Sequence, residues 1–233
     1  MNNIRKTRTR KLALLGMFSA LAFVVMMVGR VPIVMWLKYD PKDVVIAFAG
    51  LLFGPVSSLA VSLVVSAVEM VTVSDTGIIG MVMNVLSTCS VVCVAAFVYS
   101  RRRTLGGAVL GLVSGVLLMT AAMLLWNYLI TPLYMNQPRE QVAALLVPMF
   151  LPFNLFKGSL NAALTLLLYK PVVRALRRAK LIEPEEKPAA YDTPLADGEA
   201  PSNSRANLAG MLIAVAVLIA VCVVLLLVLK QML

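Results

Sequence analysis

Histidine is absent from this sequence of 233 residues, and charged residues make up only 14% of it. Without an imidazole the chain has no histidine for a zinc site, a general base or a Ser-His-Asp triad, so most familiar hydrolase mechanisms are excluded. Soluble domains are about 45–50% apolar and about 25% charged. Here 61% of the residues are apolar and the mean hydropathy is +0.91. These values exclude an ordinary water-soluble domain and indicate an integral membrane protein.

Other scarce features narrow the function further. The three cysteines, Cys89, Cys93 and Cys222, lie in apolar stretches, where a thiol usually behaves as a small hydrophobe. With no third ligand beside them we expect neither a metal site nor a cofactor. The chain has no G-x-x-x-x-G-K-[ST] sequence, so it is not itself a P-loop ATPase. It also lacks the convincing internal repeat expected of a gradient-driven carrier. A binding subunit that takes its energy from partner proteins fits better.

The net charge of +10 comes largely from Lys and Arg residues in short clusters between apolar runs, which indicates membrane topology rather than nucleic-acid binding. A basic segment, residues 1–11, precedes an apolar run at 12–29. This run of about 18 residues is long enough to span a bilayer and is followed by no small-residue cleavage site. We therefore expect a cytoplasmic N-terminus and a first transmembrane helix.

The Gly54-Pro55 pair is either a kink in one long helix or a turn between two short helices. A turn leaves most Lys and Arg residues on the cytoplasmic side, whereas a kink would put most of them outside, so the positive-inside rule favours the turn. Short helices are then expected at 41–54 and 55–72. Asp40 would be the N-cap of the first, with Pro41 at its first position.

The rest of the chain predicts an all-α membrane protein with six helices and a seventh, C-terminal one. An interfacial loop is expected at 30–40 and a polar outer loop at 131–141. Glycines 107, 111 and 115, four residues apart, indicate close helix packing. The further predicted segments are helices at 78–99, 105–129 and 152–170, an irregular lead-in at 142–151, a six-helix substrate-binding domain over 12–180, a disordered cytoplasmic linker at 181–207, and a last span at 208–229 that leaves the C-terminus outside.

Polar residues inside the spans mark a candidate site, because such side chains are costly in a membrane. Asn154, Lys157 and Asn161 have i, i+3, i+7 spacing and so share one helical face, which must point into the bundle. The other polar and aromatic residues at this outer level are Trp36, Tyr39, Glu69, Asp75, Asn84, Trp126, Asn127, Tyr128, Phe153 and Phe156. Together they predict an outward-facing pocket for a small, planar, neutral ligand that forms hydrogen bonds.

Purely structural roles for several of these residues remain open. Trp126 and Tyr128 could belong to an interfacial belt, and Asp43 could simply be a first-turn acid favoured by the helix dipole. Lys157 could pair with Glu69 or extend towards the interface. Asn84 and Asn161 could form hydrogen bonds between helices without touching a ligand.

Four segments carry a family resemblance: LKYDP at 37–41, FGP at 53–55, the region of Asn127, and PFNLFK at 152–157. Together they resemble the first loop, second helix and later ligand-binding segments of riboflavin-binding substrate subunits, the S components of the RibU type, of energy-coupling factor (ECF) transporters. The resemblance covers roughly residues 10 to 180. It implies a six-helix S-component bundle in the bacterial cell membrane that captures riboflavin on the extracellular side and is not an enzyme.

The resemblance also implies partners and site residues. The partners are a transmembrane coupling protein and two cytoplasmic ATPase subunits, in addition to membrane lipid. Small residues of the first helix, Ala13, Gly16 and Ala20, would meet the coupling protein. The implied substrate-binding residues are Leu37, Lys38, Tyr39, Asp40, Asn84, Asn127, Asn154 and Lys157.

Two other functions stay open at this point. One is an S component or small carrier for another vitamin, such as thiamine or biotin, because aromatic walls and amides do not specify the ring. The other is an intramembrane enzyme that uses Glu69 or Asp75, although the sequence offers no second facing carboxylate or metal cluster for it. The residues after 180 exceed the six-helix pattern, and we expect them to be dispensable for ligand binding.

Overall fold

The computed structural model describes residues 2–34 and 36–182 and, near the C-terminus, residues 213, 216–217, 220, 222–225 and 227. The linker expected at 181–207 lies outside the described residues apart from its first two positions, and the last span expected at 208–229 is described only in part. The described residues of that span are helical.

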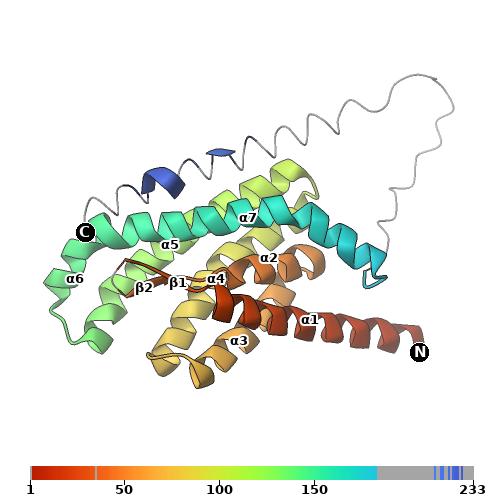
Figure 1. Cartoon of the computed structure of the whole chain (residues 1–233), viewed down its shortest axis with the longest axis horizontal. Helices are drawn as coiled ribbons and strands as arrows, with labels where there is room; N and C mark the ends of the chain where they lie inside the picture. The colour runs from red at the N-terminus through yellow and green to blue at the C-terminus, as the bar shows by residue number, and fades with distance from the viewer. Residues whose placement is uncertain are drawn as a thin grey trace.

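The described chain is helical apart from one short hairpin, which confirms the all-α membrane fold (Figure 1). The elements in chain order are α1 (Asn2–Gly29), β1 (Val31–Val34), β2 (Leu37–Tyr39), α2 (Lys42–Phe53), α3 (Pro55–Thr72), α4 (Gly77–Arg101), α5 (Leu105–Met135), α6 (Arg139–Leu145), η1 (Leu146–Phe150) and α7 (Leu151–Arg178).

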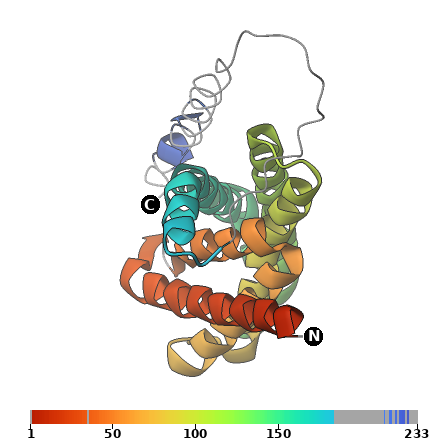
Figure 2. The same ribbon diagram turned by 90° about the vertical axis from the view of Figure 1, so that its right-hand side faces the viewer.

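Five helical stretches of the described chain are long and apolar enough to cross a membrane: α1, α3, α4, α5 and the continuous stretch Arg139–Arg178. The protein is therefore a multi-pass membrane protein. The exception is α2, whose 12 residues extend about 18 Å at 1.5 Å per residue, less than the hydrocarbon core. It is buried over Lys42–Gly50 and lies between α1 and α7, so protein rather than lipid covers it (Figures 1 and 2).

The expected turn between the two short helices is confirmed. Gly54 has φ of 92°, a backbone conformation that favours glycine, and its N–H donates to the carbonyl of Gly50 to close α2. Pro55 then begins α3, where its missing N–H leaves no helix bond unmade. The predicted bounds of both helices are correct to within one residue.

The segment expected as an irregular interfacial loop instead contains the antiparallel hairpin β1–β2, in which Val31 pairs with Tyr39 and Pro32 with Lys38. The prediction that Asp40 is the N-cap of α2 is wrong. Pro41 occupies the N-cap, and no side-chain hydrogen bond caps the helix. The carboxylate of Asp40 accepts a hydrogen bond from Arg30 instead.

Helices α5, α6 and α7 continue through positions where the sequence predicts breaks. α5 runs through Pro132 to Met135, so the outer loop expected at 131–141 shrinks to residues 136–138. The lead-in expected to be irregular is helical, with the π-helical segment η1 around Pro148 joining α6 to α7. A π-helical turn contains one extra residue, which accommodates a proline without ending the helix.

Close packing of α4 on α5 confirms the role expected for the glycine stripe. A Cβ atom on Gly111 would lie 2.9 Å from the carbonyl oxygen of Ala95, and one on Gly115 would lie 2.6 Å from that of Val91. Both distances are far shorter than a normal contact, so the two backbones can approach only because these residues lack a side chain.

Candidate functional site

A cavity of about 440 Å³ opens at the end of the bundle where the hairpin, the α3–α4 connection and the end of α5 meet. Its volume lies within the range of pockets that bind small molecules. Seven of the eight substrate-binding residues expected from the sequence line it: Leu37, Lys38, Asp40, Asn84, Asn127, Asn154 and Lys157. Tyr39, the eighth, is not among the lining residues. The structure thus brings these seven residues together from four separate segments of the chain: the hairpin with Asp40 directly after it, α4, α5 and α7.

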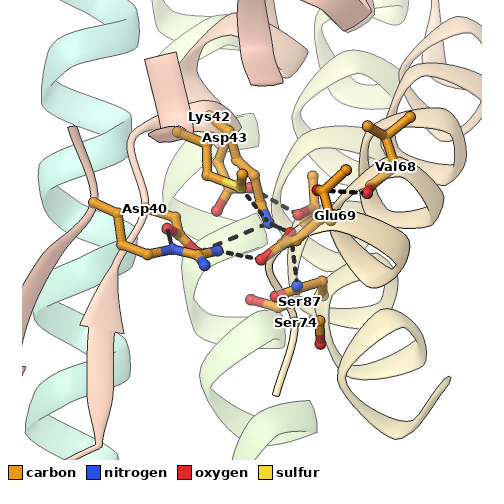
Figure 3. Close-up of polar contacts among 12 residues, drawn as sticks. Asp40, Lys42, Asp43, Val68, Glu69, Ser74 and Ser87 are labelled. Carbon is orange, nitrogen blue, oxygen red and sulfur yellow. Dashed lines mark hydrogen bonds and ion pairs between the residues drawn. The ribbon is translucent and has the colours of Figure 1, made fainter. Parts of the chain in front are cut away.

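One wall of the cavity is built on a buried group of charges that we call the Glu69 cluster: Arg30, Asp40, Lys42 and Glu69, with Asn84. Arg30 Nε donates to Asp40 Oδ1 at 2.6 Å. The two carboxylate oxygens of Glu69 accept from the Arg30 guanidinium and the Lys42 ammonium, and Asn84 Nδ2 donates to Oε2 at 3.0 Å. Figure 3 shows Asp40 and Lys42, from the stretch that leads into α2, close to Glu69 of α3.

The Glu69 cluster contains two cations and two anions, so its formal charge is balanced within the bundle. Burial alone would raise the pKa of Asp40, but the hydrogen bond from Arg30 and the nearby Lys42 more than offset this and lower it below its usual value. Asp40 therefore stays ionised at neutral pH. Lys42, which is only 1% exposed and lies at the start of α2, is not among the substrate-binding residues expected from the sequence. The unusual presence of two charges directly after Pro41 was the available signal.

A second buried group, the Lys157 cluster, consists of Asp43, Ser87, Thr88, Lys157 and Asn161, of which Ser87 and Lys157 line the cavity. Lys157 Nζ lies 3.5 Å from Asp43 Oδ2 and 3.4 Å from Ser87 Oγ. Asp43 also accepts hydrogen bonds from Thr88 Oγ1 at 2.7 Å and from Asn161 Nδ2 at 3.3 Å.

Two expectations for α7 are settled by this arrangement. Asn154, Lys157 and Asn161 are all buried, so their shared face does point into the bundle. Both alternatives given for Lys157 are wrong, because its partner is Asp43 rather than Glu69 and its ammonium does not extend to the interface. The reason is that Arg30 and Lys42 already occupy both oxygens of Glu69.

Tyr39 supports the cavity from behind rather than lining it. Its hydroxyl donates to Asn161 Oδ1 at 2.7 Å and its ring packs edge-on against Phe156, with centroids 6.2 Å apart. Burial, helped by the charge of Asp43, raises the pKa of Tyr39 above its usual value, so the phenol remains a donor. The side chain therefore ties β2 to α7.

The two amides of α5 and α7 are held by their own helices. Asn127 Nδ2 donates to the Met123 carbonyl and Asn154 Nδ2 to the Phe150 carbonyl, each at 2.7 Å. Asn127 Oδ1 also accepts from Thr131 Oγ1 at 2.9 Å. These bonds fix the orientation of both amides at the cavity wall.

Aromatic residues divide between the cavity and the periphery. Trp36 and Phe153 line the cavity, and the indole N–H of Trp36 is buried without a hydrogen-bond partner among the described residues. A buried donor of this kind is available to a ligand. Tyr128 is largely exposed under the guanidinium of Arg139, 5.6 Å from its ring centroid, as in an interfacial belt. Trp126 is partly buried against the main core.

The carboxylates considered for an intramembrane enzyme are both engaged with cations. Glu69 belongs to the cluster described above, and Asp75, on the exposed α3–α4 connection, lies 3.8 Å from the ammonium of Lys38. Among the described residues there is no group of three or more side chains able to hold a metal ion.

The small residues expected at a partner surface lie away from the cavity. Ala13, Gly16 and Ala20 are exposed along one face of α1, and a Cβ atom on Gly16 would meet no atom within 4 Å. A protein partner could therefore approach this face closely.

Several known proteins are similar to this chain in sequence, and a solved structure is similar to it in fold. The chain is 29% identical over 190 residues to "Riboflavin transporter FmnP" of Bacillus subtilis, covering 75% of this chain and 99% of that protein. It is 28% identical over 191 residues to "Riboflavin transporter RibU" of Staphylococcus aureus, covering 76% of this chain and all of that protein. A solved structure titled "Structure and mechanism of the S component of a bacterial ECF transporter" superposes with a TM-score of 0.63 at 27% identity, covering 73% of this chain and 99% of that one.

Residues 10–169, well over half of the chain, match the family described as "ECF transporter, substrate-specific component". This match agrees with the family resemblance noted in the sequence and with the expectation that the protein is a transporter subunit rather than an enzyme. The fold that carries the cavity is thus that of a known type of membrane protein, and the chain belongs to the substrate-specific component family of ECF transporters.

Proposed function

We propose that this protein captures riboflavin from the outer side of the bacterial cell membrane for uptake by an ECF transporter. The observation that carries the proposal is a cavity of about 440 Å³ whose buried charges are balanced, in a chain similar to proteins named riboflavin transporters. Because the charged side chains of the cavity wall are paired with one another, the cavity suits a ligand without a net charge. Riboflavin is neutral at pH 7 and is the transported substrate, not a cofactor.

The lining residues suit a planar heterocycle with a polar chain. Trp36 and Phe153 offer flat apolar surface, while Asn127 and Asn154 offer amide groups. Lys157 offers an ammonium whose protein contacts, at 3.4 and 3.5 Å, are long enough to leave room for a ligand acceptor. We infer that these residues, with Leu37, Lys38, Asp40 and Asn84, bind the isoalloxazine and ribityl groups, and that Tyr39 positions them.

Transport requires partners, because this chain is not itself a P-loop ATPase. We infer that it assembles with a transmembrane coupling protein and two cytoplasmic ATPase subunits. The exposed small residues Ala13, Gly16 and Ala20 are the proposed contact with the coupling protein, since small side chains allow helices to approach closely in a membrane.

The proposed topology puts the N-terminus in the cytoplasm and the cavity outside. Basic residues gather at the end of the bundle opposite the cavity, where Arg10 of α1 bonds to the carbonyl of Lys180 beyond α7. The positive-inside rule assigns this end to the cytoplasm. On this topology residues 12–180 form the substrate-binding domain, 181–207 a cytoplasmic linker and 208–229 a further span that leaves the C-terminus outside.

The direct test is the visible spectrum of the protein purified in detergent from cells grown with riboflavin. We expect a yellow preparation with stoichiometric flavin and quenched fluorescence, and weaker quenching of added riboflavin by the Asn154→Ala variant. Ser114→Ala is the matched control, because Ser114 bonds only to its own helix, on the inner part of α5.

A colourless protein that also fails to quench added riboflavin would contradict the proposal. The same titration with thiamine and biotin would then identify another vitamin as the ligand. Thiamine is disfavoured because it is a cation, and Asp40, Asp43 and Glu69 each already face a cation of the protein.

A further inference from the structure

The described part of the C-terminal helix has one covered position among exposed ones. Cys222 is 5% exposed, whereas the next two residues, Val223 and Val224, are 49% and 58% exposed. Cys222 and Leu225, which is partly buried, pack in one cluster with Tyr39 and Phe156. This helix, seen as the short blue segment beside α7 in Figure 1, therefore rests on the substrate-binding domain through a defined face.

The contact itself is close and specific. Cys222 Sγ lies 3.7 Å from the carbonyl oxygen of Phe156, within hydrogen-bond distance for a thiol. Helices in lipid associate through tight packing and hydrogen bonds rather than through the hydrophobic effect, and small residues at the contact allow it. Cysteine is the one small residue with a polar hydrogen in this stretch of mainly large aliphatic side chains.

The residues under this helix are those that join two walls of the cavity. Tyr39 is flanked by Lys38 and Asp40, which line the cavity, and Phe156 directly precedes Lys157. The Tyr39 hydroxyl and ring fasten β2 to α7, and Cys222 and Leu225 cover that junction from the lipid side.

This helix lies outside the part of the chain shared with the family. The family match ends at residue 169, and about three quarters of this chain already covers 99–100% of two relatives. The two relatives are thus matched over nearly their full lengths, while about a quarter of this chain lies outside the match. The cover over the Tyr39–Phe156 junction is therefore a feature that this chain adds to the shared fold.

We propose that the C-terminal helix braces the junction of β2 with α7 and thereby slows release of the ligand from the cavity. The ligand part of this inference rests on the proposed function. The helix restrains the two elements by packing on both, so the opening that frees the ligand must first disturb the Tyr39–Phe156 contact. The inference differs from the expectation that the residues after 180 are dispensable for ligand binding, and the dissociation rates described below decide between the two.

The test uses the full chain with an N-terminal affinity tag and a site for a specific protease inserted within residues 185–205. After purification and cleavage, we expect the C-terminal fragment to stay with the tagged domain through size-exclusion chromatography. Cys222→Trp would overfill the covered position and release the fragment, whereas Val224→Trp, at an exposed position on the same helix, would not.

The second readout is the dissociation rate of riboflavin, followed by the recovery of its fluorescence. We expect Cys222→Trp in the uncleaved chain to speed dissociation by roughly threefold to tenfold, the range of a modest coupling between sites, and Val224→Trp to leave it unchanged. Equal rates in all three proteins would overturn the restraint, and loss of the wild-type fragment on cleavage would overturn the docking.

The two proposals can fail separately. If the wild-type protein does not bind riboflavin, the proposed function fails, while retention of the fragment still reports on docking. In that case a lower unfolding temperature of Cys222→Trp than of Val224→Trp would support the brace, and equal temperatures would overturn it.

Discussion

The two charge clusters of the cavity differ in how completely their charges are used. In the Glu69 cluster, Glu69 holds two cations at once and Arg30 bridges two carboxylates. In the Lys157 cluster, one ammonium faces one carboxylate at 3.5 Å, and the remaining partners are neutral hydroxyl and amide groups. Both clusters are buried, yet only the second leaves a cation with long contacts at the wall.

This difference indicates that the two clusters have different roles, one in the stability of the fold and the other in ligand binding. A buried charge whose partner is lost is strongly destabilising, so each member of the tightly paired Glu69 cluster is needed by the others. Asp43 has two further donors, Thr88 and Asn161, and so depends less on Lys157. We therefore expect the Glu69 cluster mainly to hold the ends of α1, α2 and α3 together. We expect Lys157 to make a stronger contact with the ligand than Asp40 and Asn84 do.

The strongest test of the comparison is Glu69→Gln. This change leaves Arg30 and Lys42 buried with one carboxylate between them, and we expect a loss of about 3–5 kcal/mol in stability. The measurement is the yield of monodisperse protein and its unfolding temperature in detergent. The double variant Lys42→Met with Glu69→Gln keeps the Arg30–Asp40 pair and should recover part of the loss. Wild-type stability of the single variant would contradict a structural role for the cluster.

Lys157→Met should show the opposite pattern. Loss of a charge-assisted hydrogen bond to the ligand is expected to weaken riboflavin binding by about 1.5–3 kcal/mol, roughly tenfold to more than a hundredfold. Asp43 keeps its two neutral donors, so the unfolding temperature should fall less than in Glu69→Gln. Fluorescence titration and thermal unfolding of the same preparation measure both effects. Unchanged riboflavin affinity together with a large loss of stability would show that the Lys157 cluster, like the Glu69 cluster, stabilises the fold and does not bind the ligand.

Asn84→Leu tests whether the Glu69 cluster reaches the ligand at all. Asn84 lines the cavity and donates to Glu69 at 3.0 Å, so its removal should lower stability by about 1 kcal/mol, the usual size of one hydrogen bond. Riboflavin affinity should fall less than in Lys157→Met. If affinity instead falls by more, the amide of Asn84 rather than the Lys157 ammonium dominates recognition.

The smallest effect is expected at the exposed pair of Lys38 with Asp75. Their charged groups are 3.8 Å apart and Asp75 is 88% exposed, so water and salt screen the interaction. Asp75→Asn should change riboflavin affinity by less than about twofold at 0.15 M salt. Titrations at low and high salt would check this, and a large effect that persists in high salt would assign the pair to the binding site.

Local patterns in the sequence were enough to predict much of this site. Helical spacing put Asn154, Lys157 and Asn161 on one face, and the polar residues near the outer ends of the spans indicated where the cavity lies. The Gly54-Pro55 pair by itself allowed either a kink or a turn, and the distribution of Lys and Arg along the chain favoured the turn. Helical spacing depends on neighbours within a few residues, and the positive-inside rule needs only the order of charges along the chain.

The pairing of charges could not be read from the sequence. Glu69 and Asp43 lie on different helices, and which of them faces Lys157 depends on how α2, α3 and α7 pack together. The hairpin β1–β2 was missed because it is short and contains Pro32, a residue that weakens a strand prediction. Prolines also caused the end of α5 and the segment before α7 to be misjudged, since neighbouring helices can accommodate them in a membrane.

The π-helical segment η1 bears on how the length of the chain before α7 can vary. Its wider turn takes up one residue more than an α-helical turn, in which each residue turns the chain by about 100°. Deletion of one residue within η1 would therefore restore a regular helix and leave Asn154 and Lys157 facing the same way relative to α6. A deletion between Asn154 and Lys157 would instead turn one side chain away from the other by about 100°.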